Sequence, residues 1–444
     1  MTDRNRAKEI LNIVNKKDIR FIKLCFVDIL GQLKSISISR RELEHALRDG
    51  MGLDGSSIEG FARIYESDLL FMPDPETFKL MPAAFDGSQS AIMFGDIVTP
   101  QGEHYPGDTR YVLKQNLKKA AGLGFDGFMA GPELEYFYFS NSSKPEALDN
   151  GGYFDTVPLD ESTDLRKETI LLLEDLDIPV EYSHHEVAPS QHEIDLRYSN
   201  ALAMADKVIL YKVVVKQVAS KHNCYASFMP KPLNGVNGSG MHVHQSLFKG
   251  ERNTFFDKND TAYLSQTARH YTAGILKHVR EICAVTNQWV NSYKRLVPGF
   301  EAPVYIAWAR SNRSALVRVP QLRIGAEKSS RIECRFPDPA CNPYLAFSVM
   351  LAAGLDGIKR NLPLAKPVEA DIYEMDHLER KANKIETLPG SLLEAIEEAE
   401  KSKLLREALG EHVFEKFIEN KRIEWDNYRT QVTDYEVNRY LPIL

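Results

Sequence analysis

Hydrophobic residues recur at a spacing of three and four in several long segments of the chain, which predicts amphipathic helices. The segments are 3–16, 164–177, 200–221, 265–285 and 342–360, and the last begins with Asn342 as a cap and Pro343 in the first turn. Asp108 caps a further predicted helix that ends before Gly122. Two Ser-x-x-Glu sequences, at 39–42 and 391–394, predict capping boxes, and the helix that starts at the second extends to Gly410 as the last helix.

Hydrophobic and polar residues alternate in shorter segments, which predicts strands. Residues 19–28 and 32–38 alternate on either side of Gly31, and 91–97 forms a further strand-like run. Together with the first helices, these strands predict a small α+β unit. The segment 72–107 is rich in Pro, Gly and Asp, so we place a domain boundary near residue 105. At roughly 150 residues per domain, the 444 residues allow two or three domains, and we expect two.

The composition is that of an ordinary folded protein, with 43% hydrophobic and 26% charged residues. The net charge of −7 argues against direct binding of nucleic acid. The N-terminal segment lacks the apolar core of a secretory signal, and the longest apolar stretch, 345–355, is far shorter than the ~20 residues needed to cross a membrane. Five scattered cysteines without a Cys-x-x-Cys pair are expected to be reduced. We therefore expect a cytoplasmic protein that contacts no membrane.

Polar residues at every second position mark segments that carry candidate chemistry, because such side chains share one face of a strand. The segments carry Glu133 and Glu135; His242 and His244; Arg331, Glu333 and Arg335; and, on two sides of a Pro-containing connection, Glu186 and Glu193. Any single pair is more often a solvated strand face, in roughly three cases of four. Together, however, carboxylates about 4 Å apart repel by about 1 kcal/mol in water and about 4 kcal/mol at an effective dielectric of about 20. A compensating cation is expected, and the oxygen-rich ligand set favours Mg²⁺ or Mn²⁺ over zinc.

Basic residues gather around the Glu333 segment. They lie in 291–295 and 313–318 and at Lys328, Arg331 and Arg335. The arginines alone fit a salt-bridged surface equally well. Divalent ions together with several arginines are typical of phosphoryl transfer, in which one arginine can contribute about 10³ to 10⁵ in rate. The chain has no G-x-x-x-x-G-K-[ST] sequence, so any ATP would be held by metal ions and basic side chains.

Six separated motifs in a fixed order resemble those of a known family. They are Asp54-Gly-Ser-Ser-Ile, Gly131-Pro-Glu-Leu-Glu135, His185-Glu-Val-Ala-Pro, Asn237-Gly-Ser-Gly-Met-His242, Asn291-Ser-Tyr-Lys-Arg-Leu-Val-Pro-Gly and Arg331-Ile-Glu-Cys-Arg-Phe-Pro-Asp-Pro. On these motifs the chain resembles bacterial type I glutamine synthetases. The resemblance implies an α+β fold, with an N-terminal β-grasp domain over 15–100 and a catalytic domain over 107–444 whose antiparallel sheet forms an open funnel. It also implies ATP-dependent ligation of L-glutamate and ammonia to L-glutamine through γ-glutamyl phosphate, with a role in nitrogen assimilation.

The resemblance further implies roles for individual residues. At least two Mg²⁺ or Mn²⁺ ions per subunit are expected, one held by Glu135, Glu186 and Glu193 and the other by Glu133, His242 and Glu333. Glutamate would contact Glu135, Asn237, Gly238, His242, Arg295, Glu301, Arg313 and Arg335. ATP, as a substrate, would contact Glu181, His244, Ser246, Arg318, Lys328 and Arg331. Arg313 and Arg335 would neutralise charge on the transferring phosphoryl group.

Two acidic residues resemble the family's residues that act on ammonia. Asp54 would bind ammonium and remove a proton, because ammonium is not a nucleophile. Glu301 would lie on a flap over the glutamate entrance and is a candidate for accepting a later proton. In this family the first domain of one subunit completes the site of its neighbour, so we expect a double-ring homododecamer. Without the resemblance, the Asp54 motif would be interpreted as a polar turn.

Regulation is a further implication of the resemblance. Arg63 resembles the arginine that links glutamine binding to feedback inhibition in the alpha subgroup, whose members can also bind nitrogen-regulatory transcription factors. The segment after Tyr373 lacks the Leu-Pro-Pro of the adenylylated beta subgroup, which argues against covalent regulation there. Ser190 and Cys341 stand where many relatives have Gly and Ala; neither is a proposed ligand, but Ser190 lies in the loop before Glu193.

Two other functions compete with this prediction. The same fold could ligate a different amine, or a glutamate analogue, to give a γ-glutamylamide, although the intact Asp54 motif favours ammonia. A catalytically inactive regulatory or structural assembly belongs to a different class. Such an assembly is expected to lack ligands, and all six candidate metal ligands are present.

Overall fold

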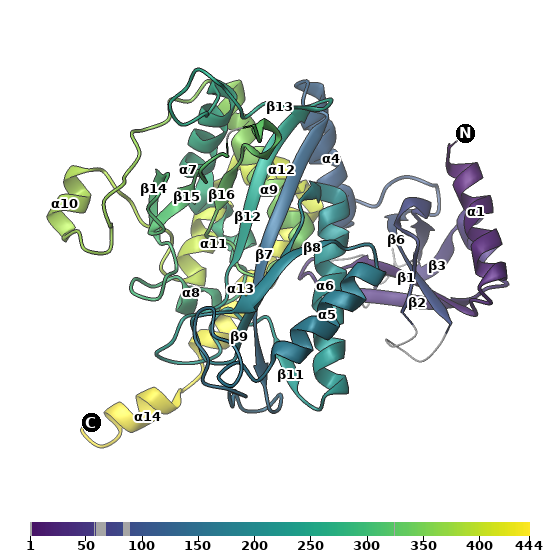
Figure 1. The fold of residues 1–444 in the computed structure, drawn as a ribbon, viewed down its shortest axis with the longest axis horizontal. Coiled ribbons are helices and arrows are strands. Elements are labelled where there is room, and N and C mark those ends of the chain that lie inside the picture. The colour runs from purple at the N-terminus through teal and green to yellow at the C-terminus, as the bar shows by residue number, and fades with distance from the viewer. Residues whose placement is uncertain (1, 57, 59–67, 83–88, 324) are drawn as a thin grey trace.

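The computed structural model describes residues 2–56, 58, 68–82, 89–323 and 325–444. Its strands form two β-sheets that lie side by side (Figure 1). The smaller sheet is N-terminal, with α1 (Thr2–Lys16) at its outer side, and the larger sheet occupies the centre of the molecule. The α+β fold class predicted from the sequence is confirmed, because helices pack on both sheets.

The N-terminal sheet contains the predicted hairpin. Its strands are β1 (Phe21–Val27), β2 (Leu33–Ser39), β3 (Met51–Asp54), β4 (Asp68–Pro73), β5 (Lys79–Leu80) and β6 (Ser90–Val98), in the order β2-β1-β6-β4-β3 with β5 beside β6. β1 is antiparallel to β2 and parallel to β6. Ile10 of α1 and Leu43 of α2 (Leu43–Asp49) join Leu24 and Phe71 of the strands in one buried core.

Two details of this unit differ from the sequence prediction. The capping box at 39–42 is wrong: Ser39 is the last residue of β2, where it pairs with Phe21, and α2 begins only at Leu43 without a side-chain cap bond from Glu42. The pattern also misses β3, β4 and β5. β5 has two residues and β3 has four, including Gly52, which is too few to establish an alternation.

The larger sheet is built around two long neighbouring strands, β7 and β12 (Figure 1). Its strands are β7 (Gly127–Phe139), β8 (Val180–His185), β9 (Gln191–Leu196), β10 (Ser199–Asn200), β11 (Tyr225–Ser227), β12 (Met241–Lys249), β13 (Arg252–Asn253), β14 (Tyr305–Ala309), β15 (Ala315–Arg318) and β16 (Ile332–Cys334). The main path runs β14-β15-β16-β12-β7-β9-β8. The sheet is antiparallel as expected, except that β14 and β15 run parallel.

The helices of this part mostly begin and end near the predicted residues. They are α4 (Thr109–Gly122), α5 (Thr163–Asp175), α6 (Ala201–Lys221), α7 (Gln266–Thr286), α8 (Ser292–Arg295), α9 (Pro343–Lys359), α10 (His377–Ala382), α11 (Leu392–Lys401), α12 (Lys403–Leu409), α13 (Glu411–Arg429) and α14 (Asp434–Tyr440). The predicted caps are confirmed, since Asp108 accepts the backbone N–H of Arg110 and Asn342 accepts that of Tyr344. No helix in the described part of the chain combines the length and apolarity needed to span a membrane.

The C-terminal region corrects a second prediction. The single helix expected from Ser391 to Gly410 is two helices, because Ser402 adopts an extended backbone conformation and caps α12 by accepting the backbone N–H of Leu405. Nor is it the last helix, since α13 and α14 follow. α13 buries Phe414 and Phe417, whereas no residue of α14 is buried and this helix projects from the body at the C-terminus (Figure 1).

The two sheets are held together by buried polar contacts. Arg110 of α4 donates to Asp74 and Asp96 of the N-terminal unit at 2.7 and 2.8 Å, and to Asp206 of α6 at 3.1 Å. The turn of the β1–β2 hairpin packs on the start of α9. Gly31 has a positive φ there, and a Cβ atom at this position would lie 2.9 Å from the Cα of Asn342.

Candidate active site

The register of the larger sheet brings the predicted carboxylates and imidazoles together. Glu133 of β7 lies opposite His242 of β12, and Glu135 lies opposite Glu193 of β9. On the other side of β12, His244 lies opposite Glu333 of β16. Because directly opposed residues on one face of a sheet have neighbouring Cβ atoms, these four strands contribute to one polar surface.

This surface lines a cavity of about 310 Å³. Its walls include all six predicted metal ligands, all predicted glutamate residues and one predicted ATP residue: Glu133, Glu135, Glu186, Glu193, Asn237, Gly238, His242, Arg295, Glu301, Arg313, Arg318, Glu333 and Arg335. The apolar residues between them, such as Leu134, Val243 and Cys334, are fully buried on the other face of the strands. The alternation expected from the sequence therefore holds at the site.

One group of ligand atoms forms the Glu333 cluster, which consists of Glu133, His242 and Glu333. Their ligand atoms lie within 4.8 Å of one another. Arg318 Nε donates to Glu333 Oε2 at 2.5 Å and Arg335 donates to Glu333 Oε1 at 2.7 Å. Burial raises the pKa of Glu333, but the charges of Arg335 and the nearby imidazoles together have a larger, opposite effect. The pKa is lowered to about 2. Glu333 is therefore ionised and compensated by the protein itself.

A second group forms the hairpin cluster, which consists of His184, Glu186 and Glu193 on the β8–β9 hairpin. Its ligand atoms also lie within 4.8 Å of one another, and His184 Nε2 is 3.0 Å from Glu186 Oε1 and 3.7 Å from Glu193 Oε2. Burial, followed by repulsion from Asp195 and Glu135, raises the pKa of Glu193 well above its usual range. Neighbouring Glu135 has its pKa raised to about 8 by burial and then by the charge of Glu186.

The two clusters fit divalent metal ions. Each offers carboxylate oxygens and one imidazole nitrogen within a few ångströms, a donor set suited to Mg²⁺ or Mn²⁺. Glu133, His242 and Glu333 are the residues predicted to share one ion. In the other group His184 lies closest to Glu186 and Glu193, and Glu135 lies between the clusters, 3.9 Å from His242 Nε2.

The residues predicted to bind glutamate line the same cavity as the two clusters. Asn237 Nδ2 donates to Glu301 Oε2 at 2.9 Å, and Glu301 has a positive φ of 55° in the segment after Gly299. The Arg295 guanidinium is buried and donates to the carbonyls of Arg335, Phe336 and Pro337. A Cβ atom at Gly240 would lie 2.5 Å from an Arg295 nitrogen, so any larger residue there would displace the Arg295 guanidinium from this position.

The residues predicted to bind ATP line a separate, adjoining cavity of about 530 Å³. Glu181, His244, Ser246, Lys328 and Arg331 all line it, whereas Arg318 lines the first cavity. Glu133 and Tyr182 line both. His244 connects the cavities, because its Nε2 is 2.6 Å from Glu133 Oε1 while Arg331 Nε donates to its Nδ1 at 3.1 Å.

Comparison with known proteins gives the same family over both sheets. The family model described as glutamine synthetase, catalytic domain, matches residues 106–440, and the one described as glutamine synthetase, beta-Grasp domain, matches residues 18–100. The chain is 49% identical to the glutamine synthetase of Thermotoga maritima, over 97% of this chain and 98% of that protein. The chain belongs to the glutamine synthetase family. It is accordingly an enzyme of the ligase class.

Other members of the family show how far the likeness extends. The glutamine synthetase of Mycolicibacterium smegmatis is 49% identical, over 99% of this chain and all of that protein. Among solved structures, Plasmodium falciparum glutamine synthetase has a TM-score of 0.88 at 28% identity, covering 98% of both chains. A complex of GmaS with ADP has a TM-score of 0.88 at 31% identity, covering 97% of this chain and 99% of that chain.

One predicted residue, Asp54, is not part of the glutamine synthetase funnel described above, and another, Arg63, is not described. Asp54, at the end of β3, is exposed and lines neither cavity; its Oδ1 accepts the backbone N–H of Ser56 at 2.8 Å. Arg63 lies outside the described residues, as does Ser57 of the Asp54 motif. Neither prediction is tested by a contact within this chain.

Several residues of the funnel were not predicted from the sequence. Tyr153, Tyr182, His184 and Gln191 line it, and Gln191 Nε2 donates to Glu135 Oε2 at 2.9 Å. His184 could have been found, because it stands two residues before Glu186 and so shares a strand face with it. Tyr153 comes from a loop about 30 residues earlier in the chain, and no local pattern indicates that position.

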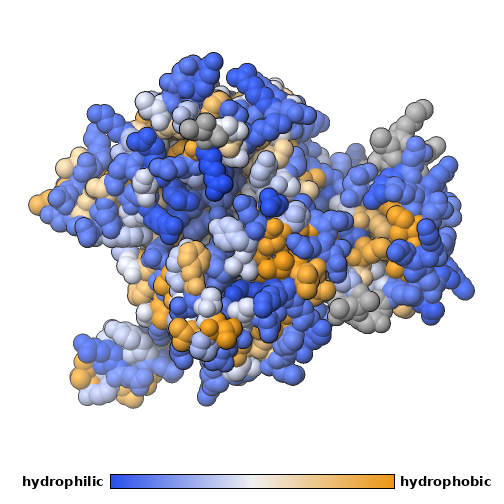
Figure 2. Space-filling view, in the orientation of Figure 1, coloured by the Kyte–Doolittle hydropathy of each residue, from blue (hydrophilic) through white to orange (hydrophobic). Residues whose placement is uncertain are grey.

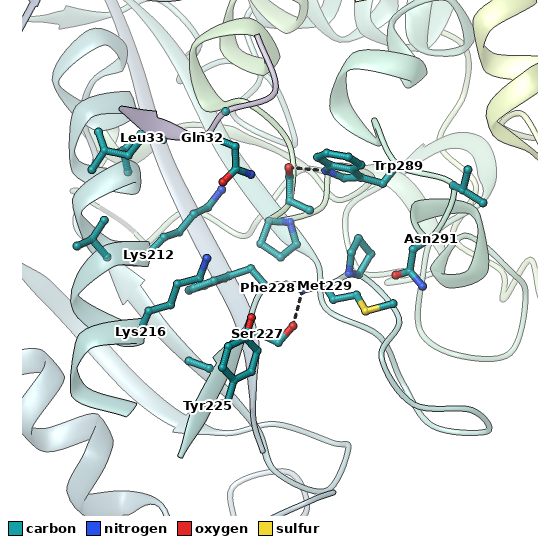
Figure 3. A pocket seen from close by; sticks show the side chains of 18 of the residues that line it. Gln32, Leu33, Lys212, Lys216, Tyr225, Ser227, Phe228, Met229, Trp289 and Asn291 are labelled. Atoms are coloured by element: carbon teal, nitrogen blue, oxygen red, sulfur yellow. Dashed lines mark hydrogen bonds between the residues drawn. The ribbon is translucent and has the colours of Figure 1, made fainter. Parts of the chain in front are cut away.

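A larger cavity of about 640 Å³, shown in Figure 3, shares no lining residue with the acidic funnel. It is bounded by the β1–β2 turn, α6 and the segments after β11 and α7, with Gln32, Lys212, Phe228 and Trp289 on its walls. The ammonium groups of Lys212 and Lys216 lie 6.0 and 5.8 Å from the centre of the Phe228 ring. None of the predicted site residues that the structure describes lines this cavity.

Proposed function

We propose that this enzyme joins L-glutamate to ammonia through γ-glutamyl phosphate and releases ADP, phosphate and L-glutamine. The observation that carries the proposal is that the two acidic clusters line one cavity together with the residues expected to bind glutamate, and that this cavity adjoins the one lined by most of the residues expected to bind ATP. Glu133 belongs to both cavities. A phosphoryl group that enters from the ATP side would therefore meet a carboxylate that enters from the other side.

The metal ligands are proposed as predicted, with at least two Mg²⁺ or Mn²⁺ ions per subunit. Glu133, His242 and Glu333 would hold one ion, and Glu135, Glu186 and Glu193 the other, with His184 beside them. When bound, such ions supply electrostatic stabilisation of the phosphates and of the attacking carboxylate. Burial first, and neighbouring carboxylates second, raise the pKa values of Glu135 and Glu193, so a bound cation would favour their ionised forms.

Arginines are proposed to stabilise the first step. A γ-carboxylate oxygen of glutamate bonds to the γ-phosphorus of ATP, the bond from that phosphorus to the bridging oxygen breaks, and ADP leaves. Arg313 and Arg335 line the cavity in which this transfer would occur. The Arg335 guanidinium donates to Glu333 Oε1 at 2.7 Å, which fixes it beside the Glu333 cluster at the wall of this cavity.

The second step needs neutral ammonia. Asp54 is proposed to take a proton from ammonium, the ammonia nitrogen then bonds to the acyl carbon, and phosphate leaves. Glu301 is proposed to cover the glutamate entrance and to accept the proton that the new amide loses. Its bond to Asn237 supports this role, because closure at this point excludes water from an acyl phosphate that hydrolyses readily.

We also propose a homo-oligomer, with a double-ring dodecamer as its form. Two features support association. Asp54 is exposed and outside the funnel of its own chain. The C-terminal projection exposes apolar side chains, including Val432, Leu441 and Leu444, at the lower left of Figure 2. Such a segment is typical of a protein–protein interface. The domain limits 15–100 and 107–444 and a cytoplasmic role in nitrogen assimilation belong to the same proposal.

Regulation by glutamine through Arg63 is proposed from the resemblance alone, as is binding of nitrogen-regulatory transcription factors in the alpha subgroup. Tyr373 bears on the alternative of covalent control. Its hydroxyl donates to the Ala302 carbonyl at 2.7 Å and its pKa is raised to about 12, chiefly by burial. A hydroxyl engaged in this way is poorly available for modification, which supports feedback control instead.

The test is ADP release with Mg²⁺, with substrates omitted one at a time. We expect release to require both L-glutamate and ammonia. Release that is independent of either substrate would contradict the assignment. Replacing ammonia by ethanolamine or a polyamine tests ligation of another amine, and a faster reaction with that amine would replace the proposed substrate.

A further inference from the structure

A buried polar group lies behind the hairpin cluster and has no part in the mechanism described above. It consists of Asp149, in the loop before α5, His185 at the end of β8, and Ser190 at the turn before β9. Asp149 is 3% exposed, and His185 and Ser190 are fully buried. Burying a carboxylate is costly unless it accepts several hydrogen bonds, so the contacts of Asp149 indicate what it holds in place.

One oxygen of Asp149 connects three segments. Oδ1 accepts the backbone N–H of Ser190 at 2.8 Å and that of Gly151 at 3.3 Å, and it lies 3.0 Å from His185 Nε2. His185 is the last residue of β8, and Ser190 directly precedes β9. Asp149 therefore joins both sides of the β8–β9 hairpin to its own loop.

Contacts of its ring and of its backbone carbonyl fix the position of His185. Its Nδ1 lies 2.7 Å from the carbonyl oxygen of Glu186, so both ring nitrogens face oxygen acceptors. A Cβ atom at Gly151 would lie 2.7 Å from His185 Nε2, which means that the loop backbone packs directly on the ring. The His185 carbonyl in turn accepts the backbone N–H of Phe154 at 3.1 Å.

The Ser190 side chain also binds the backbone of the loop that contains Asp149. Its Oγ accepts the backbone N–H of Leu148 at 2.5 Å and that of Asp149 at 3.0 Å. Its φ of 57° is in the left-handed region, which is unfavourable for a residue other than glycine. The two bonds to Oγ offset that cost, and they are available only because this chain has serine at a position where glycine would avoid the strain.

The same hairpin carries two of the proposed metal ligands, Glu186 and Glu193. Glu186 directly follows His185, and its backbone N–H donates to the Gln191 carbonyl at 2.8 Å, two residues before Glu193. The loop continues from Asp149 to Tyr153, which lines the funnel and whose ring centre is 5.3 Å from that of His184. A displacement of Asp149 would therefore move the ligands and one wall of the funnel together.

We propose that Asp149, with His185 and Ser190, is a positioning residue that holds the Glu186 and Glu193 carboxylates at the separation needed to bind one divalent ion. The inference rests on the proposed function for the identity of the ion. Side chains that orient metal ligands typically contribute about 10- to 100-fold in metal affinity. The Glu333 cluster lies on β7, β12 and β16 and has no contact with Asp149 among the described residues. The effect should therefore fall on one of two ions.

The experiment is calorimetric titration of the full-length protein with Mn²⁺ and no other substrate. For the parent protein we expect two sites per chain. Asp149→Asn should weaken one site about 10- to 100-fold and leave the other within about twofold. The matched control is Asp108→Asn, because Asp108 is also a buried aspartate that accepts two backbone N–H groups, those of Ile97 and Arg110, but it lies at the junction of the sheets. The control should lower the melting temperature and leave both sites unchanged.

Two outcomes would overturn the proposal and are distinguishable from failure of the proposed function. Unchanged Mn²⁺ binding by a folded Asp149→Asn variant, or equal weakening of both sites, would show that Asp149 does not position this ligand set. A parent protein that binds no Mn²⁺ would instead contradict the metal-dependent function on which the inference rests.

Ser190 is tested by two substitutions that separate its contacts from its backbone strain. Ser190→Ala keeps the strain and loses Oγ, whereas Ser190→Gly loses Oγ and relieves the strain. We expect both variants to weaken the same Mn²⁺ site about threefold to tenfold, with the glycine variant melting at the higher temperature. Parent-like affinity in both variants would remove Ser190 from the positioning group.

Discussion

The two acidic clusters of the funnel differ in how their charge is compensated. In the Glu333 cluster, Arg318 and Arg335 contact the central carboxylate at 2.5 and 2.7 Å. In the hairpin cluster, no guanidinium in the described part of the chain lies within 4.0 Å of Glu186 or Glu193, and His184 is the nearest basic group. The first cluster is therefore organised by the protein's own cations. In the second, hydrogen bonds and the charge of His184 outweigh burial and lower the pKa of Glu186, whereas burial and neighbouring carboxylates raise that of Glu193, so an added cation would favour the ionised form of Glu193.

The largest effect is expected from the removal of Arg335, which contacts Glu333 in the first cluster. Arg335→Ala removes both one partner of Glu333 and a guanidinium at the wall of the cavity in which phosphoryl transfer is proposed. We expect the rate of ADP release to fall by about 10³ or more. The exposed pair Arg360–Asp356 provides the control, since Arg360→Ala should leave the rate within about twofold. Loss of less than tenfold in the Arg335 variant would separate this residue from the chemistry.

The clusters should respond in opposite directions when one carboxylate is made neutral in the metal-free protein. Because the pKa of Glu333 is lowered to about 2 from 4.5, Glu333→Gln should destabilise the fold by on the order of 3 kcal/mol. Because the pKa of Glu193 is raised, Glu193→Gln should stabilise it. Chemical unfolding in EDTA measures both changes. Shifts of the same sign would contradict the distinction between the clusters.

The pH dependence of the metal-free protein sharpens the same distinction. Glu135 has a folded pKa of about 8 and an ordinary value of 4.5, so between these values the unfolded chain has released a proton that the folded chain retains. Stability should therefore fall as the pH rises from about 5 to about 8. Mg²⁺ should raise the melting temperature more at pH 8 than at pH 5, and Glu135→Gln should reduce that difference. An equal effect of Mg²⁺ at both pH values would contradict the expectation.

The smallest expected effect concerns a neutral side chain beside the hairpin cluster. Gln191 Nε2 donates to Glu135 Oε2 at 2.9 Å and to the Gly238 carbonyl at 3.1 Å. Gln191→Ala should weaken Mn²⁺ binding and raise the KM for glutamate about threefold to tenfold. Gln288 is a matched buried glutamine that donates to the Leu30 and Ala340 carbonyls. Gln288→Ala should affect stability and neither of these two quantities.

Much of the candidate site could be predicted because its polar residues recur at every second position of a strand and therefore share one face. Glu133 and Glu135 share a face of β7, and the register of antiparallel neighbours then brings His242 and Glu193 opposite them. The long helices could be predicted equally well, because three or more turns of hydrophobic periodicity define each of them. The sequence could not supply which strands pair, and the structure shows this; the resemblance implied only which side chains share an ion.

The misses have physical reasons of the same kind. Ser402 interrupts a continuous helical pattern because its side chain caps α12, and its Oγ also donates to Glu281 of α7, a partner 121 residues away. Asp149 has no periodic pattern around it, and its importance depends on contacts with residues about 40 positions later. Local patterns report on faces of helices and strands, whereas these two residues act through distant parts of the chain.

The most direct test of the proposed reaction follows one oxygen atom. Glutamate labelled with ¹⁸O in its γ-carboxylate is turned over with unlabelled ATP, ammonia and Mg²⁺, and the released phosphate is analysed by mass spectrometry. If the carboxylate attacks the γ-phosphorus and ammonia then displaces phosphate from the acyl carbon, each phosphate carries one ¹⁸O atom from glutamate. Unlabelled phosphate formed together with glutamine would contradict the acyl phosphate route.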